Sequence, residues 1–182
     1  MNKSDILIAK KTLLLLEKKS WENIKLNDLK TNYKKSLKTF KSKNDLLKNL
    51  NRYIDYCLNI EIKSIETSSP KDMLFEVIMA RFDILQKNRK SFVMLYDYFK
   101  LKPQKLLFLL PSFLESMLIT ASLAKINIKG INGSITIKGI FVIYIATFFK
   151  WVDDTSNSLE KTMTVLDQYL TYVLKIKKYI NR

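Results

Sequence analysis

FKSKNDLLKNLNRYIDYCL, residues 40–58, combines a helix start signal with a helical stripe. Apolar side chains recur there and just beyond at positions 46, 47, 50, 54, 58, 62 and 65, the spacing of one helix face. Ser42 precedes this stripe and Asp45 would lie in its first turn, a pattern typical of a helix N-terminus. The segment therefore predicts an amphipathic helix from Ser42 to about residue 66.

Two weaker helical patterns precede this segment. Apolar residues spaced among Lys and Glu over 5–19 predict a first helix of about four turns. Over 24–40 the apolar anchors are sparse, which is the spacing of two short helices separated by a turn.

Further helices are predicted after residue 66. Pro70 fits the first turn of a helix whose core face comprises Met73, Leu74, Val77, Ile78, Phe82 and Leu85. A short aromatic helix is expected over 91–101, and another starts at Pro103, is kinked or divided at Pro111 and reaches Ile126. A flexible loop is predicted over Lys129–Gly133. Two long helices follow, over 135–152 and from 158 to about 178.

Composition agrees with a helical fold. Apolar residues make up 47% of the 182 residues, whereas Gly and Pro number only three each, too few turn-formers for a many-stranded β protein. The sequence therefore predicts an all-α protein.

Residues 135–152 are apolar enough to raise the question of a membrane span. Their longest uncharged run, Gly139–Phe149, has 11 residues, against about 20 for a spanning helix. Burial between neighbouring helices and a partner subunit explains the pattern better. The N-terminus carries charges throughout and no secretory signal, so a cytoplasmic location is expected.

Positive charge is concentrated at the N-terminus. The net charge is +15, but residues 1–54 hold 14 basic and five acidic groups, net +9. Such an excess favours a polyanionic partner. Since 28 of the 32 basic residues are Lys, a Lys-biased proteome remains the alternative source.

The residue types argue against an enzyme. There is no His, one Cys and no nucleophile paired with a base at a meaningful spacing. Asp153 and Asp154 are interpreted as turn and cap residues. No catalytic residue, metal or cofactor is therefore assigned.

Several segments resemble the TetR superfamily. Ser20, Trp21, Ile24, Leu26, Asp28 and Leu29 resemble the entry to its helix-turn-helix, and FKSKNDLL at 40–47 resembles the F-x-S-K-x-x-L-L start of its fourth helix. Residues 71–83 and 151–167 are similar to a group of α-proteobacterial TetR-like proteins. Residues 151–167 are also similar to ubiquinone-biosynthesis accessory proteins, which share this fold, bind isoprenoid lipid and do not regulate transcription.

The resemblance implies a TetR-like fold of about nine helices. An N-terminal helix-turn-helix-type module of three helices, residues 1–45, would precede a helical ligand-binding and dimerisation body, residues 46–182. A homodimer is expected through 134–152 and 158–178, because both helices are more apolar than one monomer core requires.

The resemblance also implies binding to double-stranded DNA through the N-terminal module. The candidate DNA-binding residues are Lys25, Lys30, Tyr33, Lys34, Lys35, Ser36, Lys38, Thr39, Lys41 and Lys43. Lysines there would contact phosphate, and Tyr33, Ser36 and Thr39 would add hydrogen bonds. However, the ten residues between Leu29 and Phe40 are fewer than the family usually has, and they lack its A-G-V-S turn. A solvated lysine face is the alternative.

Aromatic and Met residues of the body are candidates for an apolar effector pocket. They are Met79, Phe82, Phe92, Phe108, Phe113, Met117, Phe141 and Tyr144. Their helical spacing equally fits a plain core. Two hypotheses follow: a TetR-type transcriptional regulator with a hydrophobic effector, or a non-enzymatic lipid-binding accessory protein whose N-terminal module no longer reads DNA.

Overall fold

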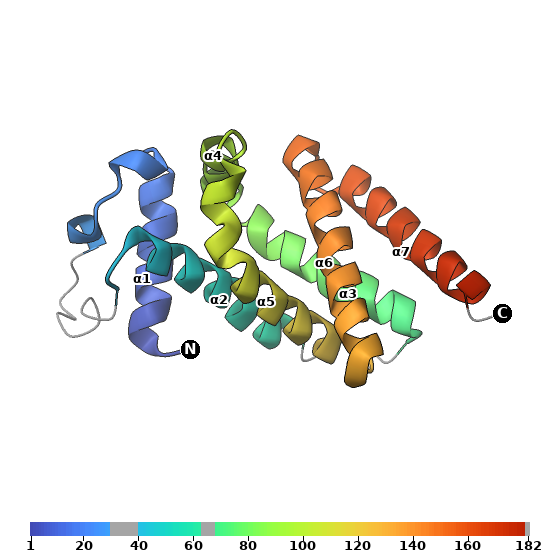
Figure 1. The fold of residues 1–182 in the computed structure, drawn as a ribbon. Coiled ribbons are helices and arrows are strands. Elements are labelled where there is room, and N and C mark those ends of the chain that lie inside the picture. The colour runs from blue at the N-terminus through green and yellow to red at the C-terminus, as the bar shows by residue number, and fades with distance from the viewer. Residues whose placement is uncertain (30–39, 63–67, 181–182) are drawn as a thin grey trace. The chain divides into compact units, whose positions relative to one another are not determined.

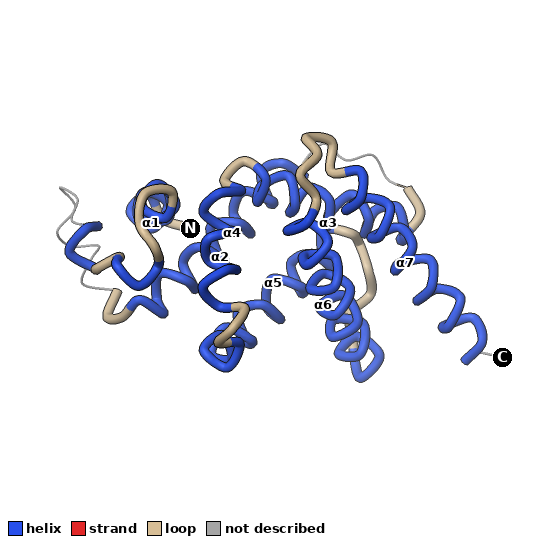
Figure 2. Tube along the Cα trace, turned by 90° about the horizontal axis from the view of Figure 1, so that it is seen from above, coloured by secondary structure: helices blue, strands red, loops and turns tan. Residues whose placement is uncertain are grey.

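The polypeptide forms helices joined by loops (Figures 1 and 2). This computed structural model describes residues 1–29, 40–62 and 68–180, with side chains described as far as Val173, and contains no strand in those ranges. The elements described are α1 Lys3–Leu16, η1 Trp21–Asn23, η2 Leu26–Leu29, α2 Lys43–Glu61, α3 Pro70–Gln86, α4 Arg89–Phe99, η5 Pro103–Leu109, α5 Leu110–Leu123, α6 Gly130–Asp153 and α7 Glu160–Ile180. The elements labelled η are short 3-10 helices. The predicted all-α class is confirmed.

The predicted starts of α2 and α3 are confirmed. α2 begins one residue after Ser42, and α3 begins at Pro70. Ser69 Oγ accepts a hydrogen bond from the Asp72 amide at 3.2 Å and donates one to the Asp72 carboxylate at 2.6 Å. The predicted core face of α3 is buried throughout. α2 ends at Glu61, earlier than predicted, and the rest of the predicted helix falls mainly on residues 63–67, outside the described ranges.

The prediction of a flexible loop over Lys129–Gly133 is wrong. Residues 130–133 are the first turn of α6, and Lys129 is its N-cap. Gly130 has φ of +66°, a conformation that suits glycine. Gly133 serves close packing, because a Cβ at this position would overlap the backbone carbonyl of Ile128. Gly130 and Gly133 are therefore required by the backbone at the start of α6 and do not mark a loop. The loop lies before Gly130.

Replacing Gly133 with alanine is expected to destabilise the protein by about 3 kcal/mol, because a backbone carbonyl cannot move aside as a side chain can. Gly139 provides the matched control in the same helix, since an added Cβ there meets no atom within 4 Å. Gly139→Ala should stabilise α6 by about 0.5–1 kcal/mol through its helix propensity. Thermal unfolding of both variants tests this; a Gly133→Ala protein as stable as wild type would disprove the close approach.

One of two compact units comprises Met1–Ile60 and Ile84–Ser116. Within it α1 packs against α4, and the Ser91 hydroxyl of α4 donates to the Leu13 carbonyl of α1 at 2.8 Å. The Asn49 amide of α2 donates to the Asp5 carbonyl at 2.9 Å, which ties α2 to the same helix. The first helix is thus held by two others. The division of the chain into residues 1–45 and 46–182 remains a prediction.

The second unit comprises Glu61–Asp83 and Met117–Arg182, and α6 packs along α7 within it. Phe82 stacks on Tyr144, with ring centroids 5.3 Å apart, and lies 6.3 Å from Trp151. Asp154 is the fully buried C-cap residue of α6. Its Oδ2 accepts hydrogen bonds from the amide and the hydroxyl of Thr162, each at 2.9 Å. The turn and cap role predicted for Asp154 is confirmed.

Two helical stretches are long and apolar enough to cross a membrane by length and composition: Pro103–Leu123 and Gly130–Asp153. Core helices of water-soluble proteins pass the same test. In the most apolar windows of these stretches only 28% and 33% of the residues are buried, so much apolar surface is exposed on this single chain. Pro111 divides the first stretch, because α5 starts at Leu110 after the 3-10 turns of η5.

Candidate nucleic-acid interface

The segment that enters α2 is held by one carboxylate. Asp45 Oδ2 accepts hydrogen bonds from the amides of Lys41 and Ser42, both at 2.8 Å, and from the Ser42 hydroxyl at 3.1 Å. Burial acts to raise the pKa of Asp45, but these hydrogen bonds outweigh it and hold that pKa below its ordinary value. The carboxylate therefore stays ionised at the positive end of the helix dipole and holds the backbone of Lys41 and Ser42 at the entry to α2.

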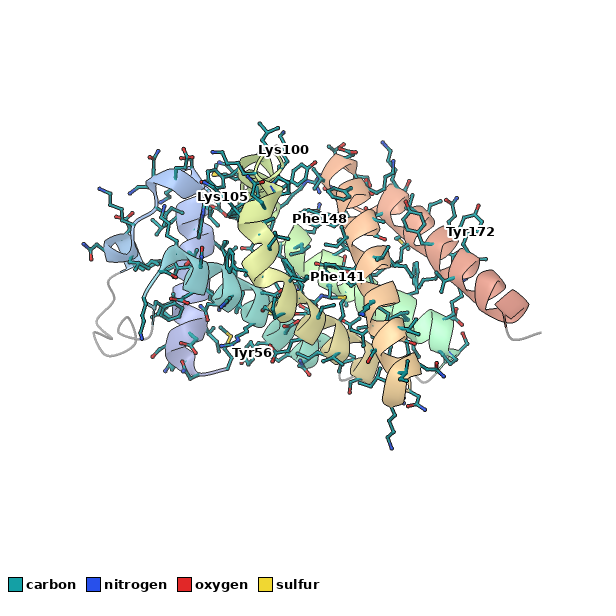
Figure 3. All side chains as sticks on the ribbon, in the orientation of Figure 1. Tyr56, Lys100, Lys105, Phe141, Phe148 and Tyr172 are labelled. Carbon is teal, nitrogen blue, oxygen red and sulfur yellow. The ribbon has the colours of Figure 1, made fainter. Side chains whose placement is uncertain are left out.

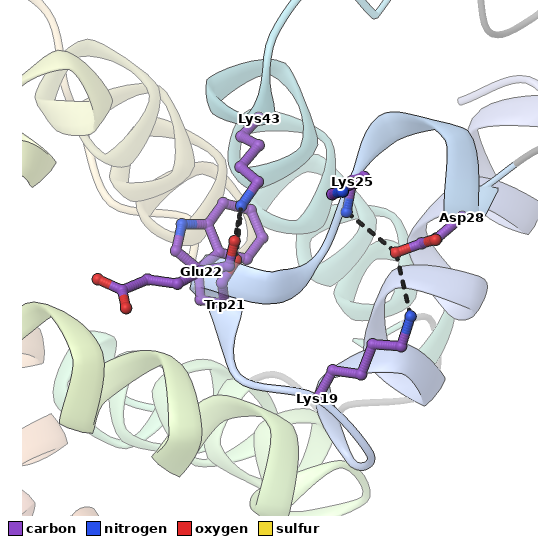
Figure 4. A network of polar contacts seen from close by, with 6 residues as sticks. All are labelled: Lys19, Trp21, Glu22, Lys25, Asp28 and Lys43. Atoms are coloured by element: carbon purple, nitrogen blue, oxygen red, sulfur yellow. Dashed lines mark hydrogen bonds and ion pairs between the residues drawn. The ribbon is translucent and has the colours of Figure 1, made fainter.

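A second carboxylate, that of Asp28, anchors the chain just before residue 30. Asp28 in η2 accepts a hydrogen bond from the Lys25 amide at 3.0 Å and forms an ion pair with Lys19 Nζ at 3.3 Å (Figure 4). The backbone hydrogen bond from Lys25 is the main cause of a lowered pKa at Asp28. Leu29, the last residue of η2, is fully buried. The chain is thus anchored by hydrogen bonds on either side of residues 30–39.

Lys43 connects the two sides of this site (Figure 4). Its Nζ donates to the backbone carbonyls of Trp21 and Glu22, both at 2.8 Å, and lies 5.4 Å from the Trp21 ring centroid. Desolvation lowers the pKa of Lys43, against the pull of Glu22 and Asp28. Two of its three donors therefore hold η1 onto α2. The resemblance implied a phosphate contact for Lys43; the structure shows a bracing role that the sequence did not indicate.

The candidate DNA-binding residues fall into three groups. Lys25 and Lys41 are exposed beside the two anchored points, and Lys43 is engaged with carbonyl groups. The other seven lie outside the described residues: Lys30, Tyr33, Lys34, Lys35, Ser36, Lys38 and Thr39. Sequence reasoning missed the bracing pair of Lys19 and Asp28, which only a folded turn brings together.

The candidate pocket residues are divided between the two units. Phe82, Met117 and Tyr144 are buried in the second unit together with Met79, and Phe141 is half-buried there. The remaining candidates belong to the first unit, where Phe92 is buried and Phe108 and Phe113 are half-buried. The structure brings Phe82 and Tyr144 into direct stacking contact, which is what a packed core requires. A ligand pocket there remains a prediction.

α6 carries a row of exposed apolar side chains along its length. The row comprises Ile131, Ile135, Val142 and Phe149, and Val142 is 64% exposed. Its spacing of four, seven and seven residues places it on one helix face. On α7, Met163 and Tyr172 are also exposed; Tyr172 is labelled in Figure 3. Helix faces of this kind are normally covered by a partner.

The fold is similar to that of a solved transcriptional regulator. The crystal structure of the TetR transcriptional regulator from Nitrosomonas europaea ATCC 19718 matches 94% of this chain and 98% of its own, with a TM-score of 0.71 and 19% sequence identity. The chain therefore has a TetR-like fold. No protein-family model matches the sequence, and no curated protein matches it.

Proposed function

We propose that this protein is a DNA-binding transcriptional regulator of the TetR type. The similarity of nearly the whole chain to a TetR regulator supports this, together with a net charge of +9 over residues 1–54. Residues 24–40 would supply the two short helices of a helix-turn-helix, which brings the total to about nine, and the lysines of 30–43 would contact phosphate. The observation that supports the proposal is that Asp28 and Asp45 hold the backbone on either side of residues 30–39 by hydrogen bonds.

The regulator would respond to a hydrophobic effector bound in the body, residues 46–182. An effector that binds one arrangement of the body more tightly shifts the population toward it, and thereby changes the fit of two N-terminal modules to DNA. We place the protein in the cytoplasm, where its DNA partner is, and assign it no enzymatic activity.

DNA reading is tested by incubating the purified protein with sheared genomic DNA and sequencing the retained fragments. A regulator should enrich a small set of sites that share an inverted repeat, with half-sites about one helical turn or a multiple apart. Uniform recovery of the genome would contradict the proposal, because phosphate contacts alone carry no sequence information.

A homodimer is proposed through 134–152 and 158–178. The exposed row on α6 supports this dimer. Lys138 is exposed on the same helix face, which argues against placing that face in a bilayer, because a Lys at the centre of a bilayer costs about 3 kcal/mol. A symmetric dimer buries the row against its own copy or against α7 of the partner and leaves the Lys138 side chain a route to water.

Val142→Glu is expected to weaken the dimer at least about 100-fold, because the symmetry buries two unpaired charges at once. Analytical ultracentrifugation measures the change in dissociation constant. Ile60→Glu is the matched control, since Ile60 on α2 is 51% exposed and lies outside the two helices. Equal dissociation constants for wild type and Val142→Glu would rule out this face.

The alternative is a lipid-binding accessory protein whose N-terminal module no longer reads DNA. The short segment between Leu29 and Phe40 favours it, as does the engagement of Lys43 by carbonyl groups. The two functions separate by mutation. Polar substitution at the half-buried Phe141 should weaken retention of a hydrophobic ligand and spare DNA binding, whereas reversal of the N-terminal lysines should do the opposite. Solvent extraction of the purified protein, followed by mass spectrometry, provides the lipid readout.

A further inference from the structure

Exposed leucines are concentrated where α4 gives way to η5. Leu101 is 81% exposed and Leu107 is 67% exposed, and Leu110 follows at 40%. Single exposed leucines are common on protein surfaces, but here three lie within the segment Lys100–Leu110, which we call the α4–η5 corner. Leu109, in the same segment, is buried. The corner therefore has a side fixed to the core and a side that presents apolar groups to solvent.

Lysines alternate with these leucines. Residues 98–114 contain Lys100, Lys102 and Lys105 and no acidic residue. Lys100 and Lys105, both labelled in Figure 3, are exposed. Lys100 pairs with Asp97 at 2.7 Å, and Lys102 pairs with Glu22 at 3.3 Å. Both pairs are exposed to solvent, where such pairs are weak and the lysines can turn to another anion.

Tyrosine rings support the ammonium groups of the corner. Lys102 Nζ and Lys105 Nζ lie 4.8 and 5.9 Å from the centroid of the Tyr98 ring, and Lys100 Nζ lies 5.7 Å from that of Tyr96. The combination of apolar side chains, amphipathic aromatics and long cationic chains suits the boundary between lipid headgroups and acyl chains, where each group finds its preferred depth.

We propose that the α4–η5 corner docks on the surface of an anionic lipid bilayer. The leucines enter the acyl boundary, and the lysine ammonium groups meet the headgroup phosphates. The exposed leucines favour a bilayer over a nucleic acid as the partner. A polyphosphate backbone would bind the lysines but would make no favourable contact with exposed leucine side chains. The buried Leu109 keeps this stretch attached to the protein core, so the contact is peripheral. It is independent of the proposed DNA binding.

The test is co-flotation of the full-length protein with vesicles of phosphatidylcholine alone or of equal parts phosphatidylcholine and phosphatidylglycerol. Wild type should float with the anionic vesicles only, and the bound fraction should fall as salt rises. The double variant Leu101→Ser/Leu107→Ser should lower the partition coefficient at least about tenfold. Lys105→Glu should lower it about fivefold or more.

Leu14→Ser/Ile60→Ser is the matched control, because these side chains are 57% and 51% exposed in the same unit. It should change the partition coefficient less than about twofold. Circular dichroism melts show whether each variant is folded. The proposal is overturned if wild type ignores the anionic vesicles or binds both kinds equally, or if the control variant loses as much binding. It is also overturned if the corner variants bind vesicles as well as wild type does. A loss of DNA affinity or a change of oligomeric state in those variants would then assign the corner to one of those other roles.

Discussion

Replacing Lys34, Lys35 and Lys38 together with glutamate is expected to reduce DNA affinity at least about 1000-fold near physiological salt. Each lysine placed against phosphate releases condensed counterion when it binds, and each glutamate adds repulsion at the same point. The slope of log affinity against log salt should become shallower by about three, one unit for each lost contact. Fluorescence anisotropy of a labelled duplex over a salt series measures both quantities.

The control for this experiment carries the same change of net charge elsewhere. Lys90, Lys129 and Lys161 are exposed and lie outside the N-terminal module, so their reversal to glutamate should lower affinity only through long-range electrostatics, which salt screens. If the two triple variants lose affinity equally, the lysines of 30–39 act only through total charge, and a DNA-contacting role for that segment is contradicted.

Asp154→Ala is expected to destabilise the protein by about 3–4 kcal/mol. The carboxylate is fully buried and accepts hydrogen bonds from both the amide and the hydroxyl of Thr162, which is itself fully buried. Its other oxygen accepts hydrogen bonds from the Ser156 amide at 3.2 Å and the Ser156 hydroxyl at 2.6 Å. Truncation leaves the Thr162 donors without an acceptor at the junction of α6 and α7. Denaturant unfolding measures the loss.

The neighbouring carboxylate provides the control. Asp153 is exposed, so Asp153→Ala should change stability by less than about 0.5 kcal/mol. Equal effects at the two positions would show that the buried hydrogen bonds of Asp154 add little.

Asp154 should also make stability depend on pH in the acid range. Burial acts to raise its pKa, but the hydrogen bonds from Ser156 and Thr162 lower the pKa from 3.8 to about 2. Because the folded-state pKa lies below the unfolded value, this contribution is complete above pH 3.8 and declines as pH falls toward 2. Between pH 3.8 and about 2, the free energy of unfolding should therefore fall less for Asp154→Ala than for wild type. Denaturant unfolding at each pH measures this difference.

The parts of the fold that sequence predicted correctly depend on contacts within a few residues. Ser42 and Asp45 mark the start of α2 because the carboxylate bonds back across one helical turn. Pro70 marks the start of α3 because a missing amide hydrogen costs nothing in a first turn. Patterns of this kind can be recognised in sequence without knowledge of what packs against the helix.

The features that sequence did not predict depend on distant parts of the chain. Lys43 contacts carbonyls more than twenty residues away, at Trp21 and Glu22, and no spacing rule indicates that contact. The sequence around Gly133 predicts a loop, because the close approach of the Ile128 carbonyl, which requires glycine in the helix, exists only in the folded backbone. Leu101 and Leu107 illustrate the same limit, since an apolar residue in a helical pattern is expected in the core.

The proposed function depends on sequence-specific binding of DNA by this protein. The most direct test is a salt titration of the purified protein on a labelled fragment from upstream of its own gene, beside unrelated DNA of equal length. We expect tight binding that prefers the upstream fragment and persists near physiological salt. Weak binding, equal for both fragments and lost by that salt, would contradict the claim and leave lipid binding as the function to pursue.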